Sequence, residues 1–371
     1  MDVVDHARRV SITASDAAAQ AERLRRLPPT TVAALADAGL LTLCLPRVYG
    51  GPGVSPVAMI DAVAEVARGD GAAGWCAAIA STTSSMAAFL LPDVAATVYP
   101  SAATATGGVF APNGRGARAN GGFRVSGRWQ WGSGTQHCAW IVGGAMCDDG
   151  SQRVCFFPSS DVQFHDTWHS VGLRGTGSLD FSVEGALVPD EFTVRPGAAE
   201  VRVDEPLARF PNFTLLALGI AAVAIGVARR ALDELVTVAA AKIPQFSSRT
   251  LANSGFAQTE YARAEAQWRS ARAYLRDEVG SAWETAVAGG HVPVDARVAM
   301  RLAAAHAVSS SVAVTDTVFT IAGGTAVYDT SVLGRCLRDV HVMTQHIMVA
   351  PKLNETLGKH LLGAEFDASM I

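Results

Sequence analysis

The chain is poor in charged residues, and those it has are nearly balanced in sign. Aspartate, glutamate, lysine and arginine make up 17% of the 371 residues, and 34 acidic against 30 basic side chains give a formal net charge of −4. Nucleic acids and anionic membranes are recognised by clusters of positive charge. The near balance therefore predicts no nucleic-acid or membrane partner and favours a small-molecule ligand.

Patterns that hold metals, disulfides or membranes are also missing. The six cysteines include no CxxC pair, and the chain has no HExxH motif, so reduced thiols and no metal site are expected. The N-terminal residues lack the apolar segment of a signal peptide. The most apolar run, Leu215 to Ala228, is too short to span a membrane. We therefore expect a cytoplasmic protein.

Hydrophobic residues are abundant, at 49%, and their spacing changes twice along the chain. Helical spacing continues to about Tyr99, short β-type runs follow from Thr104 to about Val194, and long helical stretches return after Pro211. Four of these stretches are long enough to form a bundle: Leu215 to Ala240, Phe256 to Val287, Asp295 to Ala322 and Arg335 to Leu362. The sequence predicts a helical domain (1–103), a small antiparallel β domain (104–200) and a four-helix bundle (201–371).

This order of helices, sheet and bundle, together with the Arg338-Asp339 pair near the C-terminus, resembles the acyl-CoA dehydrogenase fold over essentially the whole chain. In dehydrogenases of this fold, a glutamate that abstracts the substrate proton stands where this chain has Ile347. Isoleucine cannot act as a base, and no carboxylate follows until Glu355. With His346 beside the vacant position, the pattern resembles the oxygenase component of two-component (group D) flavin-dependent monooxygenases.

Ser133 lies between two glycines, Gly132 and Gly134, which allow the backbone to approach a flat ring closely. The resemblance places a serine or threonine here against the flavin N5 edge. A flavin C4a-hydroperoxide collapses to hydrogen peroxide when N5 loses its proton or water enters, so an oxygenase must hold this edge dry. The same residues would also suit an ordinary hairpin turn. Trp131 either covers a flavin face or packs inside the sheet.

Two further segments are candidates for contacts to the flavin. The motif from Gly172 to Ser178 resembles a family loop beside the cofactor, where Thr176 and Ser178 could bond flavin or phosphate oxygens. Asn113 is the polar candidate in a glycine-rich segment that we expect to end a strand in a turn. A plain Asn-Gly turn is the alternative for Asn113.

The C-terminal half offers candidates that the resemblance places near a neighbouring subunit's flavin. Arg249 follows the first bundle helix, and its guanidinium could donate two charge-assisted bonds to a flavin phosphate. A solvated loop arginine is the alternative. Gly323 and Gly324 resemble the glycines that approach the flavin site of a neighbouring subunit.

His346 is the main catalytic candidate. Its position matches the family's histidine above the flavin, where it could stabilise the hydroperoxide or move a proton; a buried structural histidine is the alternative. If residues 338–362 form one helix, the side chains of His341 and His346 point in directions about 140° apart, so at most one of them can face the flavin. His137 could assist from the side of the sheet.

One departure from the family bears on the substrate. Several phenol-hydroxylating relatives carry a histidine after the motif that is Gly74-Trp75 here, whereas this chain has only hydroxyl-bearing residues there. Either the substrate ionises readily, as polyhydroxylated aromatic polyketides do, or another residue such as His137 acts as the base. A third alternative is an amine or thioether substrate that needs no deprotonation.

The resemblance implies the oxygenase component of a two-component hydroxylase. Reduced, diffusible FMN or FAD would come from a separate NAD(P)H-dependent flavin reductase, which agrees with the absence of a dinucleotide-binding fingerprint. With O2 it would hydroxylate an aromatic or polyketide-like molecule, and the protein would be a homotetramer. The alternatives are an acyl-CoA dehydrogenase with a relocated base, an N-hydroxylase of an amino sugar, and a non-catalytic bundle protein.

Overall fold

The computed structural model describes residues 2–368 and 371, and it begins with five helices. Their N-termini are set by local sequence: Ser55 and Asp70 accept hydrogen bonds from the first turns of α3 and α4, and prolines stand in the first turns of α2, α3 and α5. The bounds are α1 (Val3–Leu24), α2 (Pro29–Asp37), α3 (Pro56–Gly69), α4 (Gly71–Ser84) and α5 (Pro92–Val98).

The N-terminal cap of α3 can be used to test whether local sequence sets the start of this helix. The Ser55 hydroxyl accepts a hydrogen bond from the Ala58 amide at 3.2 Å. We expect Ser55→Ala to lower the free energy of unfolding by about 1 kcal/mol, because one N-terminal amide loses its partner. Ser55→Asp, which keeps an acceptor, should retain wild-type stability. Chemical denaturation measures both, and equal stability of the alanine variant and the wild type would contradict the assignment.

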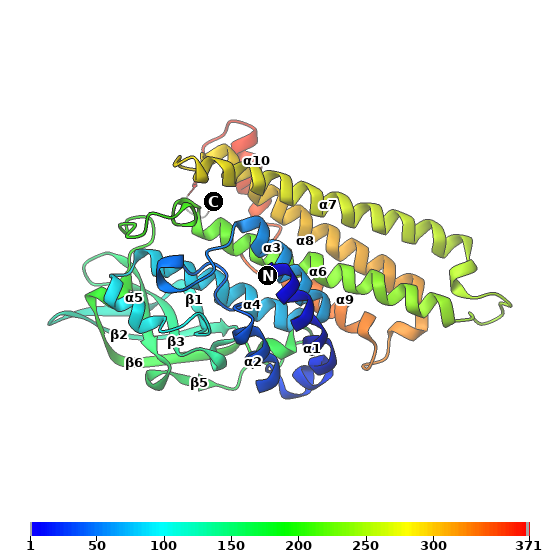
Figure 1. Ribbon diagram of the computed structural model, residues 1–371, viewed down its shortest axis with the longest axis horizontal. Coiled ribbons are helices and arrows are strands. Elements are labelled where there is room, and N and C mark those ends of the chain that lie inside the picture. Colours follow the sequence, from blue (N-terminus) through cyan, green and yellow to red (C-terminus); the bar gives the residue numbers. More distant parts are fainter. Residues whose placement is uncertain (1, 369–370) are drawn as a thin grey trace.

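The middle of the chain forms one seven-stranded sheet in the order β5-β6-β2-β1-β3-β4-β7 (Figure 1). The strands are β1 (Thr106–Ala119), β2 (Gly122–Gly132), β3 (Trp140–Cys147), β4 (Gln152–Pro158), β5 (Gln163–His165), β6 (Leu179–Pro189) and β7 (Thr193–Val194). The sheet is not wholly antiparallel as predicted, because β1 and β3 pair in parallel. The segment expected to end in a turn near Asn113 is instead part of β1, which has an irregularity between Val109 and Gly114.

Trp129 fills the centre of the sheet's packed face and is fully buried. Its indole stacks on Phe181, with ring centroids 5.2 Å apart and planes at 17°. A side chain on Gly114, Gly127 or Gly143 would come within 2.8 Å of the Trp129 ring. These glycines are therefore required by the size of the indole rather than by turn geometry.

The C-terminal half forms a helical bundle of α6 (Asn212–Ala241), α7 (Gly255–Val287), α8 (Val294–Ala322), α9 (Val332–Met343) and α10 (Leu353–Leu361). The single fourth helix predicted from Arg335 to Leu362 was wrong, since residues 344–352 are turns between α9 and α10. Pro351 lies in this break and disfavours helix at the residue before it. His346 is therefore not on a helix, and its direction does not follow from helical periodicity.

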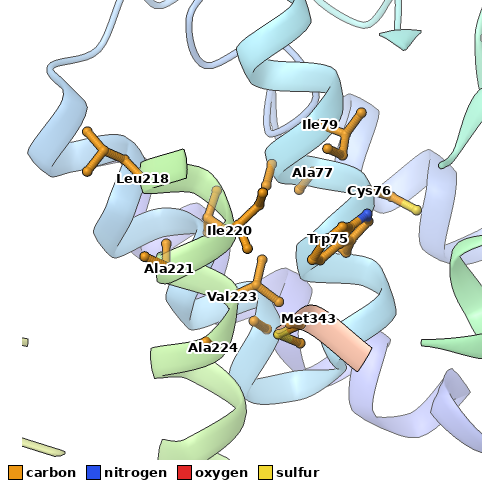
Figure 2. Packing of buried hydrophobic residues seen from close by; sticks show 14 of the residues in the cluster. Trp75, Cys76, Ala77, Ile79, Leu218, Ile220, Ala221, Val223, Ala224 and Met343 are labelled. Atoms are coloured by element: carbon orange, nitrogen blue, oxygen red, sulfur yellow. The ribbon is translucent and has the colours of Figure 1, made fainter. Parts of the chain in front are cut away.

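Two stretches, Asn212–Ala241 and Val294–Ala326, are apolar and long enough to cross a membrane. Within their most apolar windows, 83% and 61% of the residues are buried inside the protein. Figure 1 shows α6 lying among the other helices, and Figure 2 shows Ile220 and Val223 of α6 gathered with Trp75 of α4 and Met343 of α9. Burial against protein neighbours accounts for the apolar character of these helices.

Candidate active site

Three hydroxyl groups from two segments meet where the sheet adjoins α4. Ser133 Oγ lies 2.7 Å from Ser178 Oγ, and Ser178 Oγ lies 2.6 Å from Thr176 Oγ1. All three side chains are buried. The Trp75 indole Nε1–H, from α4, donates to Ser133 Oγ at 2.9 Å. We call Ser133, Thr176, Ser178 and Trp75 the hydroxyl cluster.

The backbone around the cluster is unusual for non-glycine residues. Trp131 and Leu173 have positive φ values of 64° and 50°, so the turns that carry Ser133 and Thr176 both pass through the left-handed region. Gly134 also has a positive φ, 67°, and its amide donates to the Thr176 carbonyl at 2.9 Å. This bond and the pairing of Gly132 with Leu179 hold the two segments together.

His346 approaches the cluster from the turn after α9. Its ring lies at 67° to that of Trp75, with centroids 5.7 Å apart. The Met348 amide donates to His346 Nδ1 at 3.3 Å, which assigns the proton of the neutral ring to Nε2. Burial, followed by the positive charge of Arg301, lowers the pKa of His346 to about 4. At neutral pH this histidine is therefore an uncharged hydrogen-bond donor through Nε2.

A buried arginine of α8 holds the turn that carries His346. Arg301 donates to the Met348 carbonyl at 2.9 Å and to the Phe213 carbonyl at 3.4 Å. Burial lowers the pKa of Arg301 to about 10, so it remains charged at neutral pH. The guanidinium thus fixes the backbone two residues beyond His346.

Two large apolar side chains beside the cluster are exposed, Trp131 by 67% and Ile347 by 70%. Of the two alternatives for Trp131, packing inside the sheet is wrong, since Trp129 occupies that place. A flat ring with apolar faces and a polar edge fits such a setting, because it would cover exposed apolar surface while its edge met the hydroxyl cluster. The residues present are therefore compatible with a flat ring such as that of a flavin.

His137 lies in the same turn as Ser133, and both line a partly enclosed cavity with Leu35, Ala80 and Thr106. The cavity volume is about 10 Å³, which is enough for about one water molecule but not for an aromatic ring. Its Nε2 atom is buried and has no hydrogen-bond partner among the described residues. Burial and the charge of Arg26 lower the pKa of His137 to about 4. His137 is therefore neutral and faces a water-sized space.

The remaining predicted contacts lie away from the cluster of their own chain. Asn113 is exposed on β1, six residues and about 20 Å of strand beyond Gly107, the part of β1 that is close to Ser133. Arg249 is exposed in the loop after α6, about 27 Å of helix beyond Val223. Gly323 and Gly324 are exposed at the end of α8.

Known proteins resemble the chain over nearly its full length. A family model of the acyl-CoA dehydrogenase N-terminal domain matches residues 2–94, and one of the C-terminal domain matches residues 218–351. Indole-3-acetate monooxygenase from Pseudomonas putida is 32% identical over 93% of this chain and 89% of that protein. The flavin-dependent monooxygenase oxygenase subunit HsaA of Rhodococcus jostii is 29% identical over 92% of each. The chain belongs to the flavin-dependent monooxygenases of acyl-CoA dehydrogenase fold.

Solved structures agree with this membership. The crystal structure of 3-HSA hydroxylase from Rhodococcus sp. RHA1 superposes with a TM-score of 0.93 at 27% identity, covering 100% of this chain and 99% of that one. The HsaA monooxygenase of M. tuberculosis gives the same values. The predicted fold class, the predicted class of enzyme and its dependence on flavin are thereby confirmed.

The dehydrogenase base has no replacement at the vacant position of this flavin-dependent monooxygenase. Ile347 is exposed there, and Glu355, the next carboxylate along the chain, lies in α10 and pairs with Lys359 at 2.7 Å. Among the described residues, three carboxyl groups are buried: Asp70 and Asp339 accept backbone hydrogen bonds from Ala73 and Leu173, and Asp180 pairs with Arg128 at 2.9 Å. Because these carboxyl groups are engaged in contacts that hold the fold, they are poor candidates for a relocated base, which weakens the alternative of a dehydrogenase.

Sequence reasoning missed Trp75 as a member of the site of this monooxygenase. It is the one aromatic residue of α4, which otherwise consists of small residues and Ile79 and is buried along its whole length. A single tryptophan in such a helix needs a partner for its indole N–H, and that requirement could have marked it. The identity of the partner, Ser133, depends on tertiary packing.

Proposed function

We propose that this monooxygenase hydroxylates a small aromatic molecule with reduced FMN or FAD supplied by a separate NAD(P)H-dependent reductase. The relatives include a FADH(2)-dependent resorcinol hydroxylase of Rhizobium sp. and a p-hydroxyphenylacetate 3-hydroxylase of Acinetobacter baumannii, both named as oxygenase components. Their names support an aromatic substrate and a partner reductase. The observation that carries the proposal is the direction of the hydrogen bonds within the hydroxyl cluster.

That direction follows from counting protons. A hydroxyl has one proton to donate, and Thr176 donates its own to the Leu173 carbonyl at 2.8 Å. The bond between Thr176 and Ser178 must then use the Ser178 proton, and the bond between Ser178 and Ser133 must use the Ser133 proton. Trp75 donates to Ser133 as well. Within the described residues, Ser133 Oγ is left with one accepting position and nothing to donate.

An acceptor at this position suits reduced flavin. The N5 atom of reduced flavin carries a hydrogen and can donate to Ser133 Oγ, whereas N5 of oxidised flavin is itself an acceptor. When bound, the reduced flavin supplies the electrons that activate O2. The cluster would thus favour the redox state of a diffusible reduced cofactor, and Ser133 would hold the N5 hydrogen in place.

His346 supplies the complementary group. Its Nε2–H is a donor on a neutral ring, so it can hydrogen-bond to an oxygen atom above the flavin without giving up its proton. Such a donor stabilises developing negative charge on oxygen in a site from which water is excluded. In this proposal His137 holds a water near Ser133 and does not touch the aromatic substrate.

Residues far from the cluster fit a flavin site shared between subunits. Lys242 Nζ donates to the Ala322 carbonyl, which joins the start of the Arg249 loop to the end of α8 beside Gly323. These residues lie at the end of the bundle that is remote from the sheet (Figure 1). We propose that this end meets the flavin phosphate of a neighbouring subunit in a cytoplasmic homotetramer. Asn113 stays a weaker proposal for a flavin contact.

The reaction itself can be tested with isotopically labelled oxygen. Purified protein is mixed with reduced FMN or FADH2, ¹⁸O2 and a set of phenols, indoles and amines, and the products are analysed by mass spectrometry. We expect one ¹⁸O atom in a hydroxylated aromatic product. Oxygen incorporation into amines alone would favour the N-hydroxylase alternative, and no incorporation into any compound, with no delay in flavin oxidation, would contradict the proposed function.

The redox preference of the cluster gives a separate prediction. Wild-type protein should bind reduced flavin about tenfold more tightly than oxidised flavin, the value of one hydrogen bond made in only one redox state. Ser178→Ala frees the Ser133 proton for donation, so this preference should fall or reverse. Anaerobic and aerobic titrations measure both affinities, and Ser182→Ala, which removes a hydroxyl bonded to His165, is the control. An unchanged ratio in Ser178→Ala would contradict the assigned direction.

A further inference from the structure

The Arg338-Asp339 pair has no role in the proposed function. Asp339 is 4% exposed, and its Oδ1 accepts a hydrogen bond from the Leu173 amide at 2.6 Å. The neighbouring Arg338 pairs with Glu22 of α1 at 3.1 Å. The pair therefore fixes α9 to two other parts of the chain, the N-terminal helix and the loop that leads to Thr176.

The Leu173 carbonyl is the last acceptor in the series of hydrogen bonds that runs through the hydroxyl cluster. This carbonyl accepts from Thr176 Oγ1 at 2.8 Å and from Trp168 Nε1 at 3.1 Å, while the Leu173 amide is the group bound by Asp339. The residue has a φ of 50°, which is costly for leucine and persists only where neighbours impose it. One residue thus connects a buried carboxyl group to the direction of the hydrogen bonds among the three hydroxyl groups.

The loop that contains Leu173 packs directly on α9, and the Asp339 carboxyl group packs directly on α4. A side chain on Gly172 would overlap the Arg338 carbonyl, so the loop rests directly on the backbone of α9. A Cβ on Gly71, at the start of α4, would lie 2.9 Å from Asp339 Oδ2. Asp339 is therefore confined between the loop and the first turn of α4.

We propose that Asp339 is a positioning residue for the flavin edge: by binding the Leu173 amide it holds the loop in the conformation that makes Ser133 an acceptor. This inference rests on the proposed role of Ser133. Asp339 itself touches neither flavin nor substrate. Removing it should release the strained residue, let Thr176 turn away from the Leu173 carbonyl and return a donatable proton to Ser133.

The electrostatic surroundings allow a neutral substitute for Asp339. Burial raises the pKa of Asp339 to about 7, against the opposing hydrogen bond from Leu173. Asp70 and Glu22 raise that pKa further and Arg335 lowers it. Because a large share of the carboxyl groups is protonated near neutral pH, asparagine is close to the neutral form in shape and keeps an oxygen acceptor. Asp339→Asn should therefore rescue what Asp339→Ala loses.

The anchoring step is tested without flavin, by hydrogen–deuterium exchange in the full-length protein. Asp339→Ala should speed exchange of the Leu173 amide by about tenfold, as expected for loss of one hydrogen bond, and Asp339→Asn should stay near wild type. Asp316→Ala, which removes an exposed aspartate bonded to His341, is the control. If Asp339→Ala does not fold, Gly71→Ala takes its place, since the added methyl displaces the carboxyl group. Unchanged exchange at Leu173 would overturn the proposal.

The positioning step is tested with reduced flavin and oxygen. Asp339→Ala should raise the hydrogen peroxide released per flavin oxidised, which is also the result expected for Ser133→Ala, and the double variant should release no more than Ser133→Ala alone. Faster exchange at Leu173 with unchanged peroxide release would overturn the positioning role while leaving the role of Ser133 intact. Unchanged peroxide release in Ser133→Ala would instead show that the proposed role of Ser133 has failed.

Discussion

Ser133→Ala is expected to shorten the delay before oxidised flavin reappears, after reduced flavin and oxygen are mixed with the protein, by about 10- to 100-fold. The substitution removes the acceptor for the flavin N5 hydrogen and leaves the Trp75 indole N–H and the Ser178 hydroxyl facing a gap. An unpaired buried polar group costs about 1–3 kcal/mol, which corresponds to this range of rates. Hydrogen peroxide release should rise in parallel, because the reaction is diverted from the substrate.

Stopped-flow absorbance of oxidised flavin measures this delay, and a peroxide assay measures the uncoupling. Ser182→Ala is a matched control, since it removes a hydroxyl from β6 that bonds to His165 and not to the cluster. Ser133→Thr keeps a hydroxyl and should retain part of the delay. If Ser133→Ala and the wild type oxidise flavin with the same delay, Ser133 does not face the cofactor.

Ser133, Thr176 and Ser178 could be predicted one by one from the sequence, but Trp75 and the arrangement of the cluster could not. Glycines beside Ser133 and the motif around Thr176 and Ser178 pointed to the flavin through family resemblance. That Ser133 and Ser178, 45 residues apart, share a hydrogen bond depends on the register of β2 against β6. The direction of that bond depends further on the Leu173 carbonyl, which local sequence does not place.

Two errors in the C-terminal half and the sheet have physical reasons. Helical spacing of apolar residues continues past Met343, so periodicity alone does not reveal the break before Pro351. The glycine-rich segment around Asn113 has the composition of a turn, yet Gly114 within it serves close packing, since a side chain there would meet the Trp129 ring. In β1, therefore, tertiary packing overrides the local preference of the chain.

His346→Leu is expected to lower the yield of hydroxylated product per flavin oxidised by about 100-fold, within the range that a positioned catalytic donor contributes. The leucine keeps the apolar contact with Trp75 but removes the Nε2–H donor. Flavin affinity should change little, because the proposed contact to N5 comes from Ser133. Product yield by chromatography and flavin affinity by titration separate the two effects.

The pH dependence distinguishes a neutral donor from a proton-transferring imidazolium. With a pKa of about 4, the His346 ring is uncharged in the range from pH 5 to pH 8, with its single proton on Nε2, and should produce no change of coupling there. An ordinary histidine that acted as an acid would lose coupling as pH rises through about 6.5. Moreover, His346→Gln, which keeps an N–H donor but cannot become a cation near neutral pH, should retain much of the coupling. A profile that falls across pH 6 to 7 in the wild type, together with a glutamine variant as poor as leucine, would show that His346 transfers its proton rather than holding it.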